Sequence, residues 1–351
     1  MTVFLFLLCA IAAILLMGGY YTYRIAFYSP KKGRDKISTF ASHKYDPYRK
    51  EVNRLFCQLS DRPYEEVSIE SFDGLTLFGH YYHVKDGAPL DIGFHGYRSS
   101  ALTDFAGGSE LSFSMGHNLL LIDERAHGRS EGRTITFGIQ ERWDVESWAR
   151  YAVERFGADV QIILYGVSMG AATVLMAAGL DLPENVKGII ADCPYSSPRD
   201  IIRKVARDMH MPDRLAWPFV KIGGRVYGGF DVDEMDAARA VKQAKVPILI
   251  IHGESDSFVP CEMSDIAAEN PALITRYTFP GADHGFSYLV DTPRYKKIVT
   301  EFAEKALAPK AYPPSPPGYP GGDVFAERRR SMTIPLDFSE KKNTMDAYCF
   351  P

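Results

Sequence analysis

Apolar and polar positions along the chain predict two kinds of β-strand. EVSIES and LTLFGHYYHV flank Asp73-Gly74 and alternate apolar with polar residues, which is the pattern of a β-hairpin. Later runs are continuously apolar, as parallel strands are when helices cover both faces of their sheet. These runs are IGF (92–94), NLLLI (118–122), VQIILYG (160–166), VKGIIA (186–191) and VPILIIHG (246–253). Helical stretches separate most of them, so the sequence predicts a doubly wound, mostly parallel α/β sheet.

The N-terminal segment has a different pattern. Residues 2–23 contain no charged side chain, and about 20 apolar residues are enough to cross a bilayer as a helix. A cleaved signal peptide is the alternative, but the segment lacks a basic n-region and no A-x-A site follows its apolar core. We therefore expect a retained, single-pass membrane anchor. Arg24 and the basic residues of KKGRDK follow it, so the positive-inside rule favours a cytoplasmic location for the rest of the chain.

The remaining chain divides by composition into a linker, a domain and a tail. Residues 24–63 form a polar juxtamembrane segment, and residues 64–308 contain the predicted strands. Within that domain, residues 194–240 interrupt the strand pattern with a long helical insertion that includes Trp217. We expect a cap over the ligand site, and a simple packing cluster is the alternative. Residues 309–351 begin with PKAYPPSPPGYPGG, and this density of proline and glycine predicts disorder.

Composition excludes several classes of function. The 351 residues are 46% hydrophobic and 24% charged, with a net charge of −4, so a sizeable core is expected and a nucleic-acid partner is not. The cysteines lack metal-finger spacing. The acidic run DVDEMDA (231–237) lacks the glycine and distal glutamate of a calcium loop. We expect no metal ion.

The sequence GVSMG (166–170) points to nucleophilic chemistry. It has the G-x-S-x-G form of a nucleophile elbow, a sharp strand-to-helix turn that exposes a serine hydroxyl. The preceding apolar run and the following small-residue stretch AATVLMAAGL supply the strand and the helix that the motif requires. A serine that only caps a helix is the alternative. We interpret Ser168 as a nucleophile.

A serine nucleophile needs a base and an acid that orients the base. Asp256 follows VPILIIHG, and His284 follows the next apolar segment, ITRYTFP. This gives the chain order serine, acid, histidine that the nucleophile elbow accompanies. Glu254 lies in the same loop as Asp256 and is the competing acid. We predict that Asp256 and His284 are catalytic.

Two backbone N–H groups should stabilise the oxyanion of the tetrahedral intermediate. Met169 directly follows the nucleophile and supplies one donor. The other is expected in the loop after IGFHGY, where we favour Tyr97 over Gly96.

With these motifs, the sequence resembles the serine-hydrolase branch of the α/β-hydrolase superfamily over about residues 66–308. The segments HGYRSS, IDERAHGRSEG, YGVSMGA, HGESDSFVP and GADHGFS stand in the expected order. It looks most like membrane-anchored acyl-hydrolases and prolyl-oligopeptidase-like relatives. The resemblance implies hydrolysis of an ester, thioester or amide without a cofactor, and it implies that Asp123 and His127 only shape their loop. An HGGG motif is lacking, so the resemblance to lipases and esterases that carry it is weak.

The sequence therefore favours a serine hydrolase that cleaves acyl esters or thioesters of a small-molecule or lipid substrate. A serine peptidase or aminoacyl amidase on the same triad is the second hypothesis. A non-catalytic binding protein that keeps the fold is the third.

Overall fold

A computed structural model describes residues 1–31 and 43–309 of the chain. Apart from Pro309, the tail predicted to be disordered (309–351) lies outside the described residues, as does part of the predicted juxtamembrane segment.

The described residues form one sheet of eight strands in the order β1-β2-β4-β3-β5-β6-β7-β8. The strands are β1 (Glu65–Glu70), β2 (Thr76–Tyr82), β3 (Leu90–Phe94), β4 (Asn118–Ile122), β5 (Ile162–Val167), β6 (Val186–Asp192), β7 (Ile248–Gly253) and β8 (Ile274–Phe279). The strand β2 pairs antiparallel with β1 and with β4, and all other neighbours are parallel. The predicted hairpin and the predicted parallel strands are confirmed.

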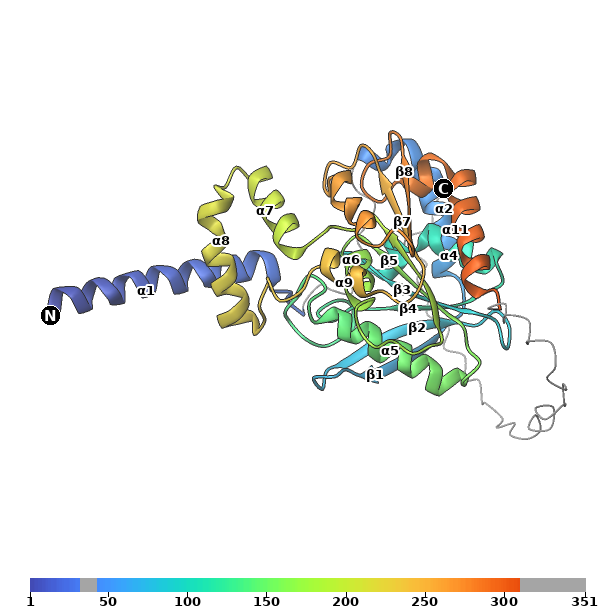
Figure 1. Cartoon of the computed structure of the whole chain (residues 1–351), viewed down its shortest axis with the longest axis horizontal. Helices are drawn as coiled ribbons and strands as arrows, with labels where there is room; N and C mark the ends of the chain where they lie inside the picture. The colour runs from blue at the N-terminus through green and yellow to red at the C-terminus, as the bar shows by residue number, and fades with distance from the viewer. Residues whose placement is uncertain (32–42, 310–351) are drawn as a thin grey trace, which may run out of the picture. The chain divides into compact units, whose positions relative to one another are not determined.

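Helices cover both faces of the sheet, which is why the central strands are apolar throughout (Figure 1). On one face, α5 (Glu141–Phe156), α6 (Met169–Ala177) and α9 (Ala237–Ala240) contribute to a core that contains Trp148 and Leu164. The helices α2 (Arg49–Ser60), α4 (Ala106–Ser114) and α11 (Thr292–Leu307) contribute to the core of the other face. Successive residues of β5 point to opposite faces, so Ile163 lies in the second core.

Short helical segments complete the described fold. They are α3 (Ala101–Asp104), α10 (Ser287–Val290), the 3₁₀ segments η2 (His43–Tyr48), η4 (Val241–Gln243) and η5 (Cys261–Glu269), and the π-helical segments η1 (Tyr23–Phe27) and η3 (Gly223–Gly228).

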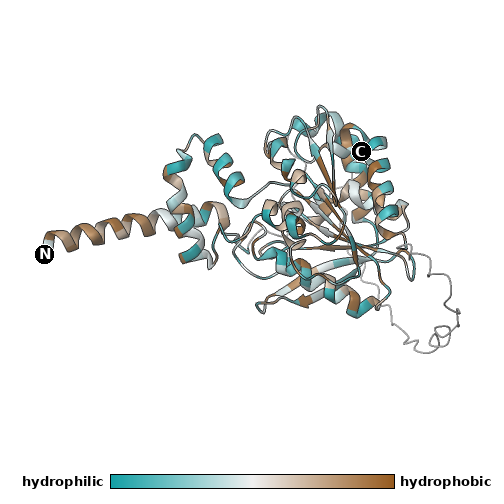
Figure 2. Cartoon of the chain, viewed as in Figure 1, coloured by the Kyte–Doolittle hydropathy of each residue, from teal (hydrophilic) through white to brown (hydrophobic). Residues whose placement is uncertain are grey.

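The N-terminal helix α1 (Thr2–Thr22) projects from the α/β domain, and its colouring in Figure 2 is apolar along most of its length. Together with η1 it is long and apolar enough to cross a membrane or to act as a signal sequence, and few of its side chains are buried.

The insertion after β6 contains α7 (Pro198–Asp208), α8 (Asp213–Ile222) and η3. The elements α8 and η3 lie beside the end of α1, and α7 packs against α8 (Figure 1). The predicted insertion, 194–240, also includes α9, but α9 packs against α6 in the layer that covers the sheet. The departure from the α/β pattern is therefore concentrated in α7, α8 and η3.

Candidate active site

Ser168 occupies the turn between β5 and α6. Its backbone has φ 56° and ψ −113°, a conformation that non-glycine residues rarely adopt and that accumulates at functional sites. The N–H of Ser168 donates to the carbonyl of Asp192, the last residue of β6, at 2.8 Å. The hydroxyl-bearing residue is thus fixed at the carboxyl edge of the sheet, where ligands of such sheets bind.

The glycines of the motif let the turn pack closely. A Cβ atom on Gly166 would lie 2.2 Å from the carbonyl oxygen of Gly170. A Cβ atom on Gly170 would lie 1.9 Å from the carbonyl oxygen of Phe94, at the end of β3. Both neighbours are backbone atoms, which a side-chain rotation cannot move out of the way.

The Gly170→Ala substitution is therefore expected to lower the free energy of unfolding by about 3 kcal/mol or more, because overpacking against backbone must displace β3 or α6. The matched control is Gly108→Ala in α4, whose new Cβ would meet side chains rather than backbone: Phe105 at 3.3 Å and Tyr165 at 3.4 Å. We expect a change within about 1 kcal/mol there. Denaturant unfolding of both variants checks this, and equal stabilities would contradict it.

The structure brings His284 between Ser168 and Asp256. The Nδ1 atom of His284 lies 2.7 Å from Oδ2 of Asp256, and its Nε2 atom lies 2.9 Å from Oγ of Ser168. A carboxylate can only accept hydrogen bonds, so Nδ1 of His284 carries a proton and donates a hydrogen bond to Asp256. In the neutral ring Nε2 is then the acceptor for the Ser168 hydroxyl.

The surroundings of Asp256 favour the ionised carboxylate, which accepts hydrogen bonds. Its side chain is fully buried, and Oδ1 accepts the N–H groups of Phe258 at 2.9 Å and Val259 at 2.7 Å. Burial raises the pKa of Asp256, but hydrogen bonds from His252 and His284 outweigh that effect and hold the pKa well below its usual range. The carboxylate therefore stays charged opposite the imidazole.

The competing acid points elsewhere. The carboxylate of Glu254 accepts the hydroxyl of Thr278 in β8 at 2.6 Å. Of the two acids in this loop, Asp256 is the one that contacts His284.

The loop after β3 lies beside Ser168. A Cβ atom on Gly96 would be 3.3 Å from Cβ of Ser168. The N–H of Gly96 donates to Asp104 at 2.6 Å, and the N–H of Arg98 donates to Nε2 of His127 at 2.9 Å. These two bonds clamp the backbone on both sides of Tyr97.

Tyr97 and Met169 keep their N–H groups available. Within residues 1–31 and 43–309, neither N–H donates to a backbone or side-chain acceptor. Met169 is the first residue of α6, where an N–H has no partner inside the helix. The N–H of Gly96 is occupied by Asp104, so Tyr97 is the better second donor.

Two supporting residues are missed by sequence reasoning. Asp104 holds the N–H of Gly96, and Nε2 of His252 lies 3.3 Å from Oδ2 of Asp256. The resemblance treats His127 and Asp123 as loop-shaping, and Asp123 accepts the N–H of Arg129 at 2.9 Å. No motif marks Asp104 or His252, because their contacts depend on how the loops after β3 and β7 fold.

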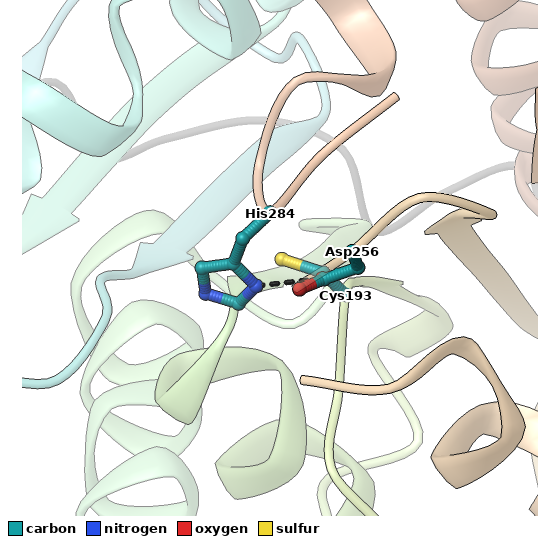
Figure 3. A group of neighbouring side chains, drawn as sticks. All are labelled: Cys193, Asp256 and His284. Atoms are coloured by element: carbon teal, nitrogen blue, oxygen red, sulfur yellow. Dashed lines mark hydrogen bonds and ion pairs between the residues drawn. The ribbon is translucent and has the colours of Figure 1, made fainter. Parts of the chain in front are cut away.

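A buried thiol lies under the acid and the base. Figure 3 shows Cys193 next to Asp256 and His284, and one potential metal-ligand atom from each lies within 4.8 Å of the others. Burial raises the pKa of Cys193 well above its usual value, so the thiol is neutral. The nitrogen of His284 that faces this group already bonds to Asp256, so the group is better suited to support the hydrogen-bonded pair than to hold a metal ion.

Comparisons with known proteins agree with this architecture. The α/β hydrolase fold family matches residues 93–216. The uncharacterized protein YqkD of Bacillus subtilis is 24% identical over 301 residues, covering 84% of this chain and 94% of YqkD. Thiohydrolase aneE of Aspergillus aculeatus is 29% identical over 162 residues, covering 44% of this chain and 48% of that protein.

A solved structure shows the same fold. The esterase Pf2001 of Pyrococcus furiosus has a TM-score of 0.58 and 22% sequence identity, covering 71% of this chain and 93% of the esterase. The matched segment of this chain contains the loop after β3 and the turn that carries Ser168. The chain therefore has the α/β-hydrolase fold, and its residues 93–216 match the model of that fold family.

Proposed function

We propose that the chain is a serine hydrolase that cleaves acyl esters or thioesters through an acyl-enzyme intermediate. The observation that carries this proposal is the hydrogen-bonded series from the Ser168 hydroxyl through His284 to Asp256, with distances of 2.9 and 2.7 Å. This arrangement activates a weak nucleophile, because the base lies within hydrogen-bond reach of the hydroxyl and a carboxylate orients the base.

In the proposed reaction, Oγ of Ser168 attacks the acyl carbon while Nε2 of His284 takes its proton. The oxyanion that forms accepts hydrogen bonds from the N–H groups of Met169 and Tyr97, and losing one such donor typically costs about 10²–10³ in rate. His284 then protonates the departing alcohol or thiol. Water enters with His284 as base, the acyl group leaves as a carboxylic acid, and Ser168 recovers its proton. No step needs a metal or a cofactor.

Ester or thioester cleavage is favoured over peptide cleavage by the named activities of similar proteins, which include a thiohydrolase and an esterase. A serine peptidase or aminoacyl amidase would use the same groups, and a non-catalytic binding protein would keep the fold without turnover.

An activity panel separates these functions. The purified full chain would be assayed on acyl esters, acyl thioesters and aminoacyl amides that share one acyl group. The proposal expects turnover of esters or thioesters at least about tenfold faster than that of amides, since an amine is a poorer leaving group than an alcohol or a thiol. Faster amide cleavage would indicate a peptidase or amidase, and no turnover of any substrate would favour a binding protein.

We further propose that α1 is a retained single-pass anchor and that the α/β domain is cytoplasmic. The support is the apolar helix followed by Arg24 and Lys31. Protease added to intact cells is then expected to leave the domain undigested, while detergent-permeabilised cells should lose it. Digestion of the domain in intact cells would reverse the orientation, and a mature chain that lacks residues 2–23 would identify a signal peptide.

A further inference from the structure

The end of α1 is docked closely onto α8. A Cβ atom on Gly18 would lie 2.3 Å from the ring of Phe219, and one on Gly19 would lie 2.4 Å from the side chain of Ile222. The hydroxyl of Thr22 donates to the carbonyl of Phe219 at 2.8 Å. Because glycine removes the side chain at both contacts, the two helices touch backbone to side chain.

The π-helical segment η3 makes a second contact with α1 that extends nearer to the N-terminus of this helix. The hydroxyl of Tyr227 donates to the carbonyl of Leu16 at 3.0 Å, and its ring lies 5.4 Å from the ring of Tyr20. The contacts of α8 and η3 therefore extend from Leu16 to Thr22. Six residues of α-helix rise about 9 Å.

This spacing sets the depth of α8 if α1 spans a bilayer. A helix of 21 residues is about 30 Å long, close to the thickness of the hydrocarbon core. The contacts with α8 and η3 fall in its last 9 Å or so, which is the depth to which interfacial helices insert their apolar faces. Tyrosines mark the same level, as they do at membrane–water interfaces; they are Tyr20, Tyr21, Tyr23, Tyr28 and Tyr227.

Large apolar side chains remain exposed in both α8 and η3, the two elements that contact α1. Leu215, in the first turn of α8, is 70% exposed, and Val226 in η3 is 57% exposed. The helix α8 runs across α1 rather than along it (Figure 1). With α1 inserted, α8 therefore lies in the plane of the bilayer.

Elements next to α1 and α8 bond to loops on both sides of the candidate site. In η1, the carbonyl of Ala26 accepts the Tyr97 hydroxyl at 2.8 Å, and the carbonyl of Ile25 accepts the Arg98 guanidinium at 2.7 Å. In α7, Lys204 donates to the carbonyl of Ser257, next to Asp256, at 2.5 Å. The loop that carries Tyr97 and the loop that carries Asp256 are thus both tied to elements that adjoin α8 and α1.

We infer that α8 and η3 rest in the surface of the bilayer that α1 spans, and that the Ser168 site takes acyl groups from molecules held in that bilayer. This inference rests on the proposed hydrolase function and anchor. The attraction is mainly apolar, because three basic side chains of α7, α8 and η3 pair with acids: Arg203 with Asp213, Lys221 with Asp233, and Arg225 with Asp231. Arg214 remains as an exposed cation of α8.

The test compares two substrates on one enzyme. The full chain is reconstituted in phosphatidylcholine vesicles and assayed on a long-chain acyl ester embedded in those vesicles and on a water-soluble short-chain ester. Leu215→Asp is expected to lower the initial rate on the embedded ester about tenfold and to change the rate on the soluble ester less than twofold. Val226→Asp should act in the same way. Adding an anionic phospholipid should change the wild-type rates less than about twofold.

Phe72→Asp is the matched control, because Phe72 is 53% exposed in the hairpin turn between β1 and β2, and neither rate should change. The unfolding temperature of each variant shows whether folding is intact. Equal rates of Leu215→Asp and wild type on the embedded ester would overturn the inference, as would equal losses on both esters. The wild type could instead self-associate without lipid, and Leu215→Asp could abolish that association. This result would show that the exposed side chains of α8 bind a second copy of the chain and not the bilayer. If wild type hydrolysed neither ester, the proposed function itself would fail.

Discussion

Replacing Ser168 with alanine is expected to lower kcat on an activated ester by about 10⁴-fold or more, because the proposed reaction proceeds through attack by its hydroxyl, which is within reach of Nε2 of His284. In subtilisin, loss of the catalytic serine lowers kcat by about 2 × 10⁶, and this sets the upper limit of the expected loss. Residual turnover should persist, since oxyanion donors and substrate binding accelerate hydrolysis on their own.

The measurement is steady-state hydrolysis by purified full-length protein, with wild type and Ser168→Ala prepared side by side. Ser168 is only 9% exposed, and removing its hydroxyl leaves the backbone bond from its N–H to Asp192 in place. The variant should therefore stay folded, and its unfolding temperature checks this. A folded variant that retains more than about a tenth of wild-type kcat would show that Ser168 is not the nucleophile.

The second large effect concerns the acid. Asp256→Asn is expected to lower kcat by about 10²–10⁴-fold with little change in KM, because an amide in place of the carboxylate can present an N–H to His284 and favour the wrong tautomer. The two N–H groups that Asp256 accepts, from Phe258 and Val259, also depend on this side chain. The unfolding temperature must therefore be measured with the activity.

Glu254→Gln is the matched control in the same loop. Its carboxylate bonds to Thr278 and not to His284, so kcat should change less than about tenfold. Similar losses in the two variants would mean that both acids support the base. A larger loss in Glu254→Gln would identify Glu254 as the orienting acid.

Much of the fold can be predicted from the sequence because the strands are buried on both faces. The run NLLLI, for example, becomes β4, whose five residues are all buried. The candidate catalytic residues are equally visible, since each follows an apolar run and the topology places those strand ends at one edge of the sheet. That these residues come together agrees with the prediction, while their catalytic roles stay a prediction until they are tested.

Other features depend on contacts that no local pattern encodes. Asp104 reaches the N–H of Gly96, eight residues earlier, only because the loop after β3 turns into α3. His252 reaches Asp256 only because the loop after β7 folds back. The docking of Gly18 against Phe219 joins segments about 200 residues apart. The sequence also suggests that the insertion continues to residue 240, but α9 follows the helix-on-sheet packing of the main domain.

The most direct test of the central claim is to map where a fluorophosphonate probe binds. The probe phosphonylates a serine only when a base activates its hydroxyl. We expect intact-mass analysis to show one adduct per wild-type chain and peptide mapping to place it on Ser168. Ser168→Ala should remain unlabelled, and Asp256→Asn should label more slowly. An adduct on another residue, or no adduct on a folded wild-type protein, would contradict the account.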